Sequence, residues 1–199
     1  ADDFVIGVIG SKKDAEKIKE DVKNFLKEKL HLDMSEEKTK VTHSSESVRY
    51  LGYDFKVIHS KNVKRCENGD MKRVWHGKVF LYVPKEKWIK KAMERNAIQV
   101  KRNNDTGKEM WRPMPRKDLM NRNDAEIVTM FNSEIRGLYN YYRIAENVGT
   151  LHQYYYMVRY SMLKTLAGKH RTTVSAIKKR YMVHGVLRVP YETTKGLKY

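Results

Sequence analysis

The chain has 199 residues, of which 40% are hydrophobic, and its 41 Lys and Arg outnumber its 24 Asp and Glu to give a net charge of +17. A chain of this size can bury a genuine core, and its charge predicts a polyanionic partner, with nucleic acid the leading candidate. No apolar run reaches transmembrane length and no secretory leader is evident, so we expect a soluble protein of the bacterial cytoplasm or, alternatively, of an organelle matrix, without a membrane partner. The single cysteine, Cys66, excludes an internal disulfide and a zinc site of paired cysteines.

The positive charge is unevenly distributed along the chain. Residues 1–55 hold 10 Lys and Arg against 12 Asp and Glu, a net charge of −2, whereas residues 56–199 hold 31 against 12, a net charge of +19. We therefore expect nucleic-acid binding to lie after the first quarter of the chain, separable from any chemistry near its beginning.

The first quarter alternates strand and helix patterns. A β-branched run from Asp3 to Ile9 predicts a buried strand, and Ser11 with Asp14 predicts the capped start of an amphipathic helix that packs on a sheet. Three further strands are predicted, over residues 31–34, 39–43 and 48–57. This order predicts an α+β fold.

The middle of the chain predicts a hairpin, a helix and a loop. Asn68-Gly69 and the β-rich run Val79–Val83 together indicate a hairpin extension, and Pro84 can open a short helix. Residues 103–122, rich in Asn, Gly and Pro, predict a connecting loop and the main domain boundary.

Three helical patterns follow that boundary. They begin at Asp124, Thr150 and Thr172, and their short links predict a small bundle. The predicted domains are residues 1–58, a basic hairpin extension with short helix and loop over 59–122, the three-helix domain over 123–185, and a tail over 186–199.

Two adjacent carboxylates, Asp2 and Asp3, stand at the start of the first predicted strand. Nucleotidyl transfer uses two metal ions held by clustered carboxylates, so a pair at a strand turn can supply part of such a site. The pair alone is weak evidence, because Asp-Asp is common in surface turns.

The surrounding motifs strengthen this interpretation. Ala1-Asp2-Asp3-Phe4 is followed by Leu32-Asp33-Met34-Ser35-Glu36-Glu37-Lys38-Thr39 and then by Tyr50-Leu51-Gly52-Tyr53. This order resembles the last three palm motifs of reverse transcriptases, most of all those encoded by group II introns. The resemblance implies a partial palm followed by a mainly helical thumb or maturase bundle, and it covers nearly the whole chain.

The resemblance also implies roles for individual residues. Asp2 would coordinate catalytic Mg²⁺ and Asp3 would support the metal site, while Lys38 would act on the leaving pyrophosphate. Leu51, Gly52 and Tyr53 would form the grip on the primer end. The complete enzyme would copy an RNA template from a DNA primer. Its fingers and first palm motif, with a further aspartate, are expected in an N-terminal segment missing from this chain, which we therefore expect not to polymerise alone.

Basic and aromatic side chains are interleaved in the C-terminal half. Basic groups neutralise phosphates and tyrosines can stack on unpaired bases. Several of these tyrosines must lie in the core, and we expect more than half of them to be buried. The tyrosines concerned are Tyr139, Tyr141, Tyr142, Tyr154, Tyr155, Tyr156 and Tyr160. Asn140-Tyr141-Tyr142 and the stretch Ser161–Lys169 also resemble the maturase domain of the same family, which implies intron RNA as the partner. The predicted RNA-binding residues are Tyr141, Lys164, Lys169, His170, Arg171, Lys178, Lys179 and Arg180.

Three hypotheses follow. The first is that the chain is part of a group II intron reverse transcriptase and maturase that promotes splicing and mobility of its intron. The second is a stand-alone RNA-binding splicing cofactor whose palm remnant is only a scaffold. The third is a basic DNA-binding protein of recombinase type, against which the motif order argues.

Overall fold

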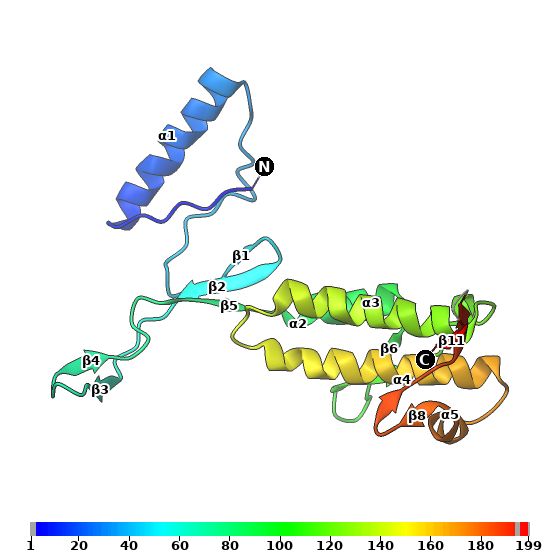
Figure 1. Ribbon diagram of the computed structural model, residues 1–199. Helices are drawn as coiled ribbons and strands as arrows, with labels where there is room; N and C mark the ends of the chain where they lie inside the picture. The colour runs from blue at the N-terminus through cyan, green and yellow to red at the C-terminus, as the bar shows by residue number, and fades with distance from the viewer. Residues whose placement is uncertain (1–2, 194–195, 199) are drawn as a thin grey trace. The chain divides into compact units, whose positions relative to one another are not determined.

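The computed structural model describes residues 3–193 and 196–198, and the chain divides into an N-terminal unit, Ala1–Tyr82, and a C-terminal unit, Val83–Tyr199 (Figure 1). Helices and strands are mixed along the chain, as the α+β prediction requires. No helix of the described residues is long and apolar enough to cross a membrane.

The first helix of the N-terminal unit, α1, spans Lys12–Leu30 and begins as predicted. The Ser11 side chain accepts a hydrogen bond from the Asp14 backbone N–H, and the Asp14 carboxylate accepts one from the Ser11 backbone N–H at 2.7 Å. This reciprocal capping box satisfies two donors that a helix start leaves unpaired. The prediction that α1 packs on a sheet is wrong, because none of the described strands packs against it and none of its residues is fully buried.

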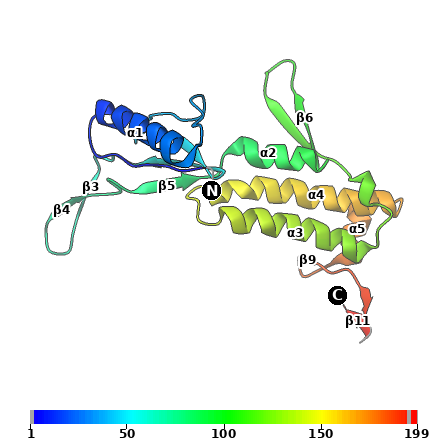
Figure 2. The ribbon, with the colours of Figure 1, turned by 90° about the horizontal axis from the view of Figure 1, so that it is seen from above.

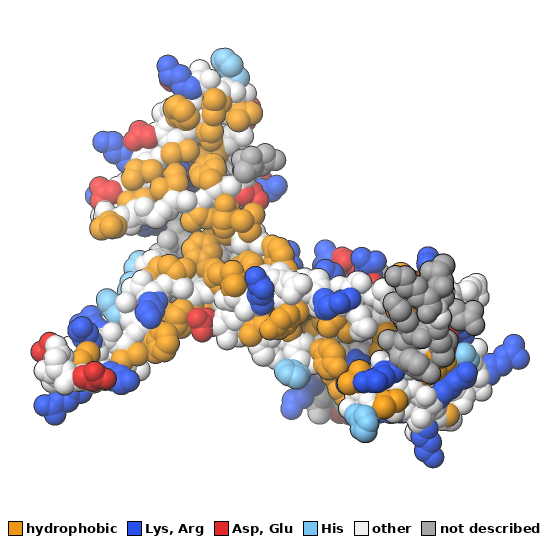
Figure 3. All heavy atoms as spheres, in the orientation of Figure 1, with side chains coloured by type: hydrophobic (Ala, Val, Ile, Leu, Met, Phe, Trp, Pro, Cys, Tyr) orange, Lys and Arg blue, Asp and Glu red, His pale blue; other side chains and the backbone are white. Residues whose placement is uncertain are grey.

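Residues 3–9 form no strand, although their composition predicted one. They run beside α1 as an irregular segment, and Phe4, Val5 and Ile6 are each about half exposed (Figure 1). A strand exists only where a neighbour completes its hydrogen-bonded ladder, and no described strand pairs with this segment. Figure 3 shows apolar side chains gathered on the surface of this unit.

One three-stranded antiparallel sheet lies in the N-terminal unit, in the order β1 (Val48–Tyr50), β2 (Tyr53–Val57) and β5 (Val79–Tyr82). The single strand predicted over 48–57 is therefore a hairpin, and residues 31–34 and 39–43 are not strands. Between β2 and β5 the Asn68-Gly69 turn connects β3 (Val63–Arg65) to β4 (Met71–Arg73), as predicted.

The C-terminal unit begins with a helix and a second hairpin. Helix α2 spans Lys85–Glu94 directly after Pro84, as predicted. Strands β6 (Ile98–Arg102) and β7 (Glu109–Pro113) pair in antiparallel register, and a 3-10 turn, η1, covers Lys117–Leu119. The loop predicted over 103–122 is thus partly a strand, because the turn residues at 103–107 connect two paired strands within this unit.

Three helices complete the unit: α3 (Asp124–Tyr142), α4 (Leu151–Lys169, preceded by η2 at Val148–Thr150) and α5 (Val174–Tyr181). The side chains that cap α3 and α5 are Asn123 and Thr173, each one residue away from the predicted cap. Short β-pairs follow, β8 (Met182–Val183) with β9 (Val186–Leu187), and β10 (Tyr191–Thr193) with β11 (Gly196–Lys198).

Helix α4 is the centre of the described core. It packs against α2, α3, α5 and the β6–β7 hairpin, and α3 runs beside it in both views (Figure 2). Side chains from several of these elements are at most 2% exposed, namely Trp88, Ile127, Phe131, Tyr154, Val158, Leu166 and Ile177. Burying each such side chain contributes about 2 kcal/mol to the stability of the fold, so this core holds the surface residues of α3, α4 and α5 in place.

Candidate nucleic-acid interface

The predicted polymerase residues lie in the N-terminal unit. Asp2 lies outside the described residues, and Asp3 is exposed, with its backbone carbonyl accepting a hydrogen bond from the Tyr50 hydroxyl at 3.2 Å. Lys38 is exposed in a turn. Residues 3–193 and 196–198 contain no group of three or more His, Cys, Asp or Glu able to hold a metal. Of the two predicted metal ligands the structure describes Asp3 alone, so the Mg²⁺ site stays a prediction.

The predicted primer grip forms the turn between β1 and β2. Leu51 and Gly52 both adopt positive φ, 45° and 77°, and Tyr50 pairs with Tyr53 across the turn. Two consecutive residues with positive φ are typical of the tight turn that matches the twist of a hairpin, and glycine adopts this conformation without strain. The turn holds the Leu51 side chain 59% exposed at its tip.

Two of the predicted RNA-binding residues hold helices together. Asp124, at the start of α3, accepts hydrogen bonds from Lys169 Nζ at 2.6 Å and from His170 Nε2 at 2.6 Å, both at the end of α4. The Tyr181 hydroxyl, at the end of α5, donates to the same carboxylate at 2.6 Å. We call these four residues the helix-end clasp. It joins three helices, and it engages Lys169 and His170 internally.

The clasp changes the acidity of two of its members. Burial disfavours the charged carboxylate of Asp124, but hydrogen bonds from Lys169, Tyr181 and His170 outweigh that effect and hold the pKa of Asp124 below its ordinary value. Burial, with the hydrogen bond to Asp124 and the charge of that carboxylate, raises the pKa of Tyr181 to about 12. Asp124 therefore remains a carboxylate, and Tyr181 a hydrogen-bond donor, at neutral pH.

A third predicted RNA-binding residue, Lys164, also makes an internal contact. Its Nζ donates to the Pro113 carbonyl at 2.9 Å, while the Ser161 hydroxyl donates to the Met114 carbonyl at 2.5 Å. The Thr165 hydroxyl accepts from the Arg116 backbone N–H at 2.9 Å. Side chains of α4 thus hold the segment 113–116, and the stretch Ser161–Lys169 is largely structural.

The remaining predicted cations are exposed. Arg171 follows α4, and Lys178, Lys179 and Arg180 lie together on α5. Lys178 Nζ lies 5.6 Å from the centre of the Tyr160 ring, which turns its charge toward an aromatic face of α4. All four side chains are exposed, and Figure 3 shows Lys and Arg projecting from this unit.

Fewer of the seven tyrosines are buried than predicted. Only Tyr142 and Tyr154 of the seven are buried, at 4% and 2% exposure, so the expectation that more than half are core is wrong. Tyr141 is 52% exposed, with its ring edge-on to Tyr142 at 4.9 Å between centroids. Most of these aromatic faces therefore remain available at the surface of α3 and α4.

Sequence reasoning missed a buried ion pair. Arg116 Nη1 lies 2.9 Å from Glu134 Oε1, and the two side chains are 5% and 13% exposed. The guanidinium also lies 5.1 Å from the centre of the Phe131 ring. Nothing in the local pattern signalled it, because the two residues are 18 positions apart and Arg116 falls in a predicted loop.

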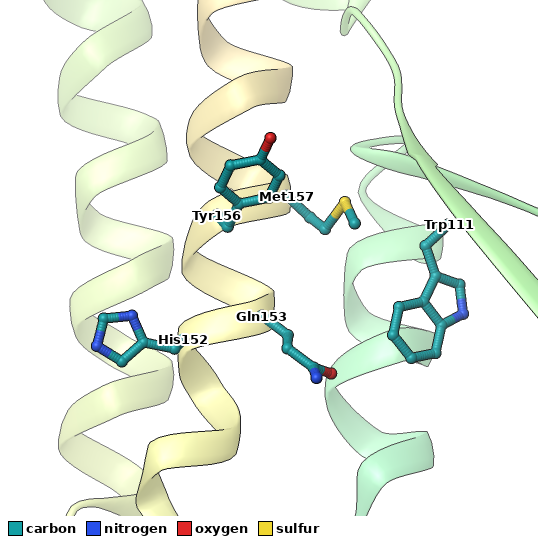
Figure 4. Close-up of a pocket in the computed structure, with 5 residues that line it drawn as sticks. All are labelled: Trp111, His152, Gln153, Tyr156 and Met157. Atoms are coloured by element: carbon teal, nitrogen blue, oxygen red, sulfur yellow. The ribbon is translucent and has the colours of Figure 1, made fainter.

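Sequence reasoning also missed a hollow between α4 and β7. It has a volume of about 360 Å³ and is lined by Trp111, His152, Gln153, Tyr156 and Met157 (Figure 4). The spacing of His152, Tyr156 and Tyr160 on one face of a helix could have indicated a shared surface, but the partner Trp111 could not be placed.

The sequence around these features lacks negative charge. Residues 147–191 contain eight Lys and Arg and no Asp or Glu. All of α4, α5 and the β8–β9 pair lie within this segment. Asp124 of α3 pairs with Lys169 and His170 of this segment. The exposed Arg171, Lys178, Lys179 and Arg180 still leave its surface with an excess of positive charge, which suits a polyanion.

Comparisons with known proteins relate this chain to proteins encoded by introns. Residues 76–196 match the family model described as type II intron maturase. The chain is 40% identical over 198 residues to the group II intron-encoded protein LtrA of Lactococcus lactis subsp. cremoris, covering 98% of this chain and 32% of the relative. It is also 31% identical over 194 residues to the COX1/OXI3 intron 2 protein of Saccharomyces cerevisiae, covering 95% of this chain and 22% of that protein.

A shorter likeness extends to plant proteins. Maturase K of Palhinhaea cernua is 34% identical over 70 residues, covering 35% of this chain and 14% of the relative. The chain spans about a third or less of the curated relatives it matches. The family match argues against the recombinase-type alternative. With its maturase match over more than half its length and its likeness to intron-encoded proteins over nearly all of it, the chain belongs to the type II intron maturase family.

Proposed function

We propose that this chain binds the RNA of a group II intron through its C-terminal unit and promotes the splicing of that intron. The single observation that carries the proposal is the exposed cluster Lys178, Lys179 and Arg180 on α5, within a 45-residue stretch, 147–191, that has no acidic residue. The family and the names of the intron-encoded relatives supply the RNA partner.

The rigidity of the unit supports this role. The helix-end clasp and the hydrogen bonds from α4 to segment 113–116 fix α3, α4 and α5 relative to one another. A rigid basic surface can stabilise one fold of an RNA over others, because phosphate contacts position the RNA without further ordering of the protein. Splicing assistance by such a surface requires no side-chain chemistry, since the intron supplies the reactive groups.

The test is charge reversal on α5. Lys178, Lys179 and Arg180 are replaced together by Glu, and binding to a group II intron RNA is measured over a range of salt concentrations. We expect weaker binding and a shallower dependence of log K on log salt, because each lost phosphate contact removes about 0.7 to 0.9 from that slope.

The matched control reverses three exposed lysines of α1, Lys13, Lys17 and Lys27, and therefore changes the net charge equally. If both triple variants lose the same affinity, binding depends on net charge alone and the α5 surface is refuted. Intron splicing at near-physiological salt, with and without each variant, gives the functional reading.

For the longer protein we propose RNA-directed DNA synthesis with an RNA template and a DNA primer. Asp2 and Asp3 would contribute to a Mg²⁺ site completed by a further carboxylate outside this chain, Lys38 would face the leaving pyrophosphate, and Leu51–Tyr53 would hold the primer end. The tight turn at Leu51 and Gly52 supports the last role, since it offers backbone for close approach to a nucleic acid. The stand-alone splicing cofactor remains the alternative, and location in a bacterial cytoplasm or an organelle matrix stays a prediction.

A further inference from the structure

We infer that the hollow between α4 and β7 receives an unpaired base of an RNA strand, and that the neighbouring Tyr160 ring receives an adjacent nucleotide. The inference deepens the proposed function and rests on it, because it specifies which form of RNA the surface grips. It concerns the residues Trp111, Gln153, Tyr156, Met157 and Tyr160, which we call the stacking strip.

The hollow has a lining that suits a nucleobase. Its volume is about 360 Å³, and Gln153 and Met157 extend from α4 toward Trp111 on β7 (Figure 4). Tyr156 is 59% exposed, so its aromatic ring is open to solvent. An exposed phenol, an indole and a thioether offer polarisable faces, while the Gln153 amide supplies donors and an acceptor for a base edge.

The strip continues along α4 as a second stacking surface. The rings of Tyr156 and Tyr160 lie 6.0 Å apart between centroids and only 29° from parallel. Helix geometry enforces this arrangement, since residues four apart share a face. Two rings of similar orientation along one helix can take successive bases of a single strand.

Cations lie at both ends of the strip. Lys85 Nζ lies 4.8 Å from the centre of the Trp111 ring, and Lys178 and Lys164 Nζ lie 5.6 and 5.9 Å from that of Tyr160. Lys85 and Lys178 are exposed, so both can reach the phosphates of a bound strand. This charge favours a polyanion over an apolar peptide, for which a purely hydrophobic groove would suffice.

The ligand must expose its base faces. Bases within a duplex are stacked on their neighbours and cannot lie on a tyrosine ring, so the strip selects unpaired nucleotides. Phosphate contacts alone, by contrast, would bind duplex and single strand alike.

The experiment compares two variants of one residue. Tyr156→Leu removes the aromatic face at similar bulk, and Tyr156→Phe keeps it. The full chain is titrated into a single-stranded RNA of about 12 nucleotides containing 2-aminopurine, and in parallel into a blunt RNA duplex. We expect Tyr156→Leu to raise Kd for the single strand about 5- to 150-fold, to abolish quenching of the 2-aminopurine, and to leave duplex binding unchanged. Tyr156→Phe should behave as the wild type.

The control is Trp75→Leu, which removes an aromatic side chain 50% exposed in the N-terminal unit, outside the residues that line this hollow, and should leave single-strand binding unchanged. Unchanged single-strand binding by Tyr156→Leu, or equal losses for single strand and duplex, would overturn the inference while RNA binding itself stands. A wild-type chain that binds neither RNA would instead refute the proposed function. Circular dichroism of each variant separates loss of binding from loss of fold.

Discussion

Replacing Asp124 with Ala should destabilise the C-terminal unit more than any other single carboxylate change at a helix end. The side chain is 12% exposed and accepts three hydrogen bonds of 2.6 Å, from Lys169, His170 and Tyr181. Partly exposed hydrogen bonds of this kind contribute about 1 kcal/mol each, so the variant should lose about 3 kcal/mol of unfolding free energy. The loss removes the link between α3 and the ends of both α4 and α5.

Urea unfolding followed by far-UV circular dichroism measures this loss as a lower midpoint at unchanged slope. The matched control is Asp118→Ala, because the Asp118 side chain is 58% exposed and lies 3.6 Å from Arg116. We expect less than about 0.5 kcal/mol from the control. If the two variants shift the midpoint equally, Asp124 does not join the three helices and the clasp is misassigned.

Three further predictions test other parts of the molecule. Because the pKa of Asp124 is lower in the folded chain than in the unfolded one, its contribution is complete above about pH 4 and is lost as the pH falls through the folded value. The stability difference between wild type and Asp124→Asn should therefore shrink as the pH falls below about 4. Glu134→Ala should cost about 3 kcal/mol because it removes the partly buried carboxylate 2.9 Å from the buried Arg116 guanidinium and leaves it only the exposed Asp118 at 3.6 Å. The double replacement Arg116→Met with Glu134→Leu should cost less in the same urea assay. Primer extension on an RNA template with Mg²⁺ should yield no product from these 199 residues, and robust synthesis would contradict the view that a further carboxylate is required.

Local signals in the sequence predicted helices well. The capping box of Ser11 and Asp14 lies within four residues, so α1 could be placed from the sequence alone. Asn68-Gly69 likewise predicted a turn because its preference for positive φ is a property of the residues themselves. The family resemblance, built on short motifs in order, is confirmed by the comparisons.

Features that depend on distant partners could not be predicted. Residues 3–9 have the composition of a strand, but a strand also needs a neighbour, and none of the described strands provides one. Lys169 and His170 have the composition of an RNA contact, yet Asp124, more than 40 residues earlier, accepts their hydrogen bonds. Charge and apolar pattern indicate what a side chain can do, while its contacts decide which role it takes.

The distribution of buried side chains has a consequence for heat absorption. No residue from Asp3 to Tyr82 is buried, and the described core begins at Val83. Melting absorbs about 0.7 kcal/mol per ordered residue near 60 °C because tightly packed groups are exposed to water. A chain melting as a whole would absorb about 140 kcal/mol, whereas the 117 residues from Val83 to Tyr199 account for about 80. In a calorimeter, melting of this chain should therefore absorb about 80 kcal/mol, the heat expected of a protein of 117 residues.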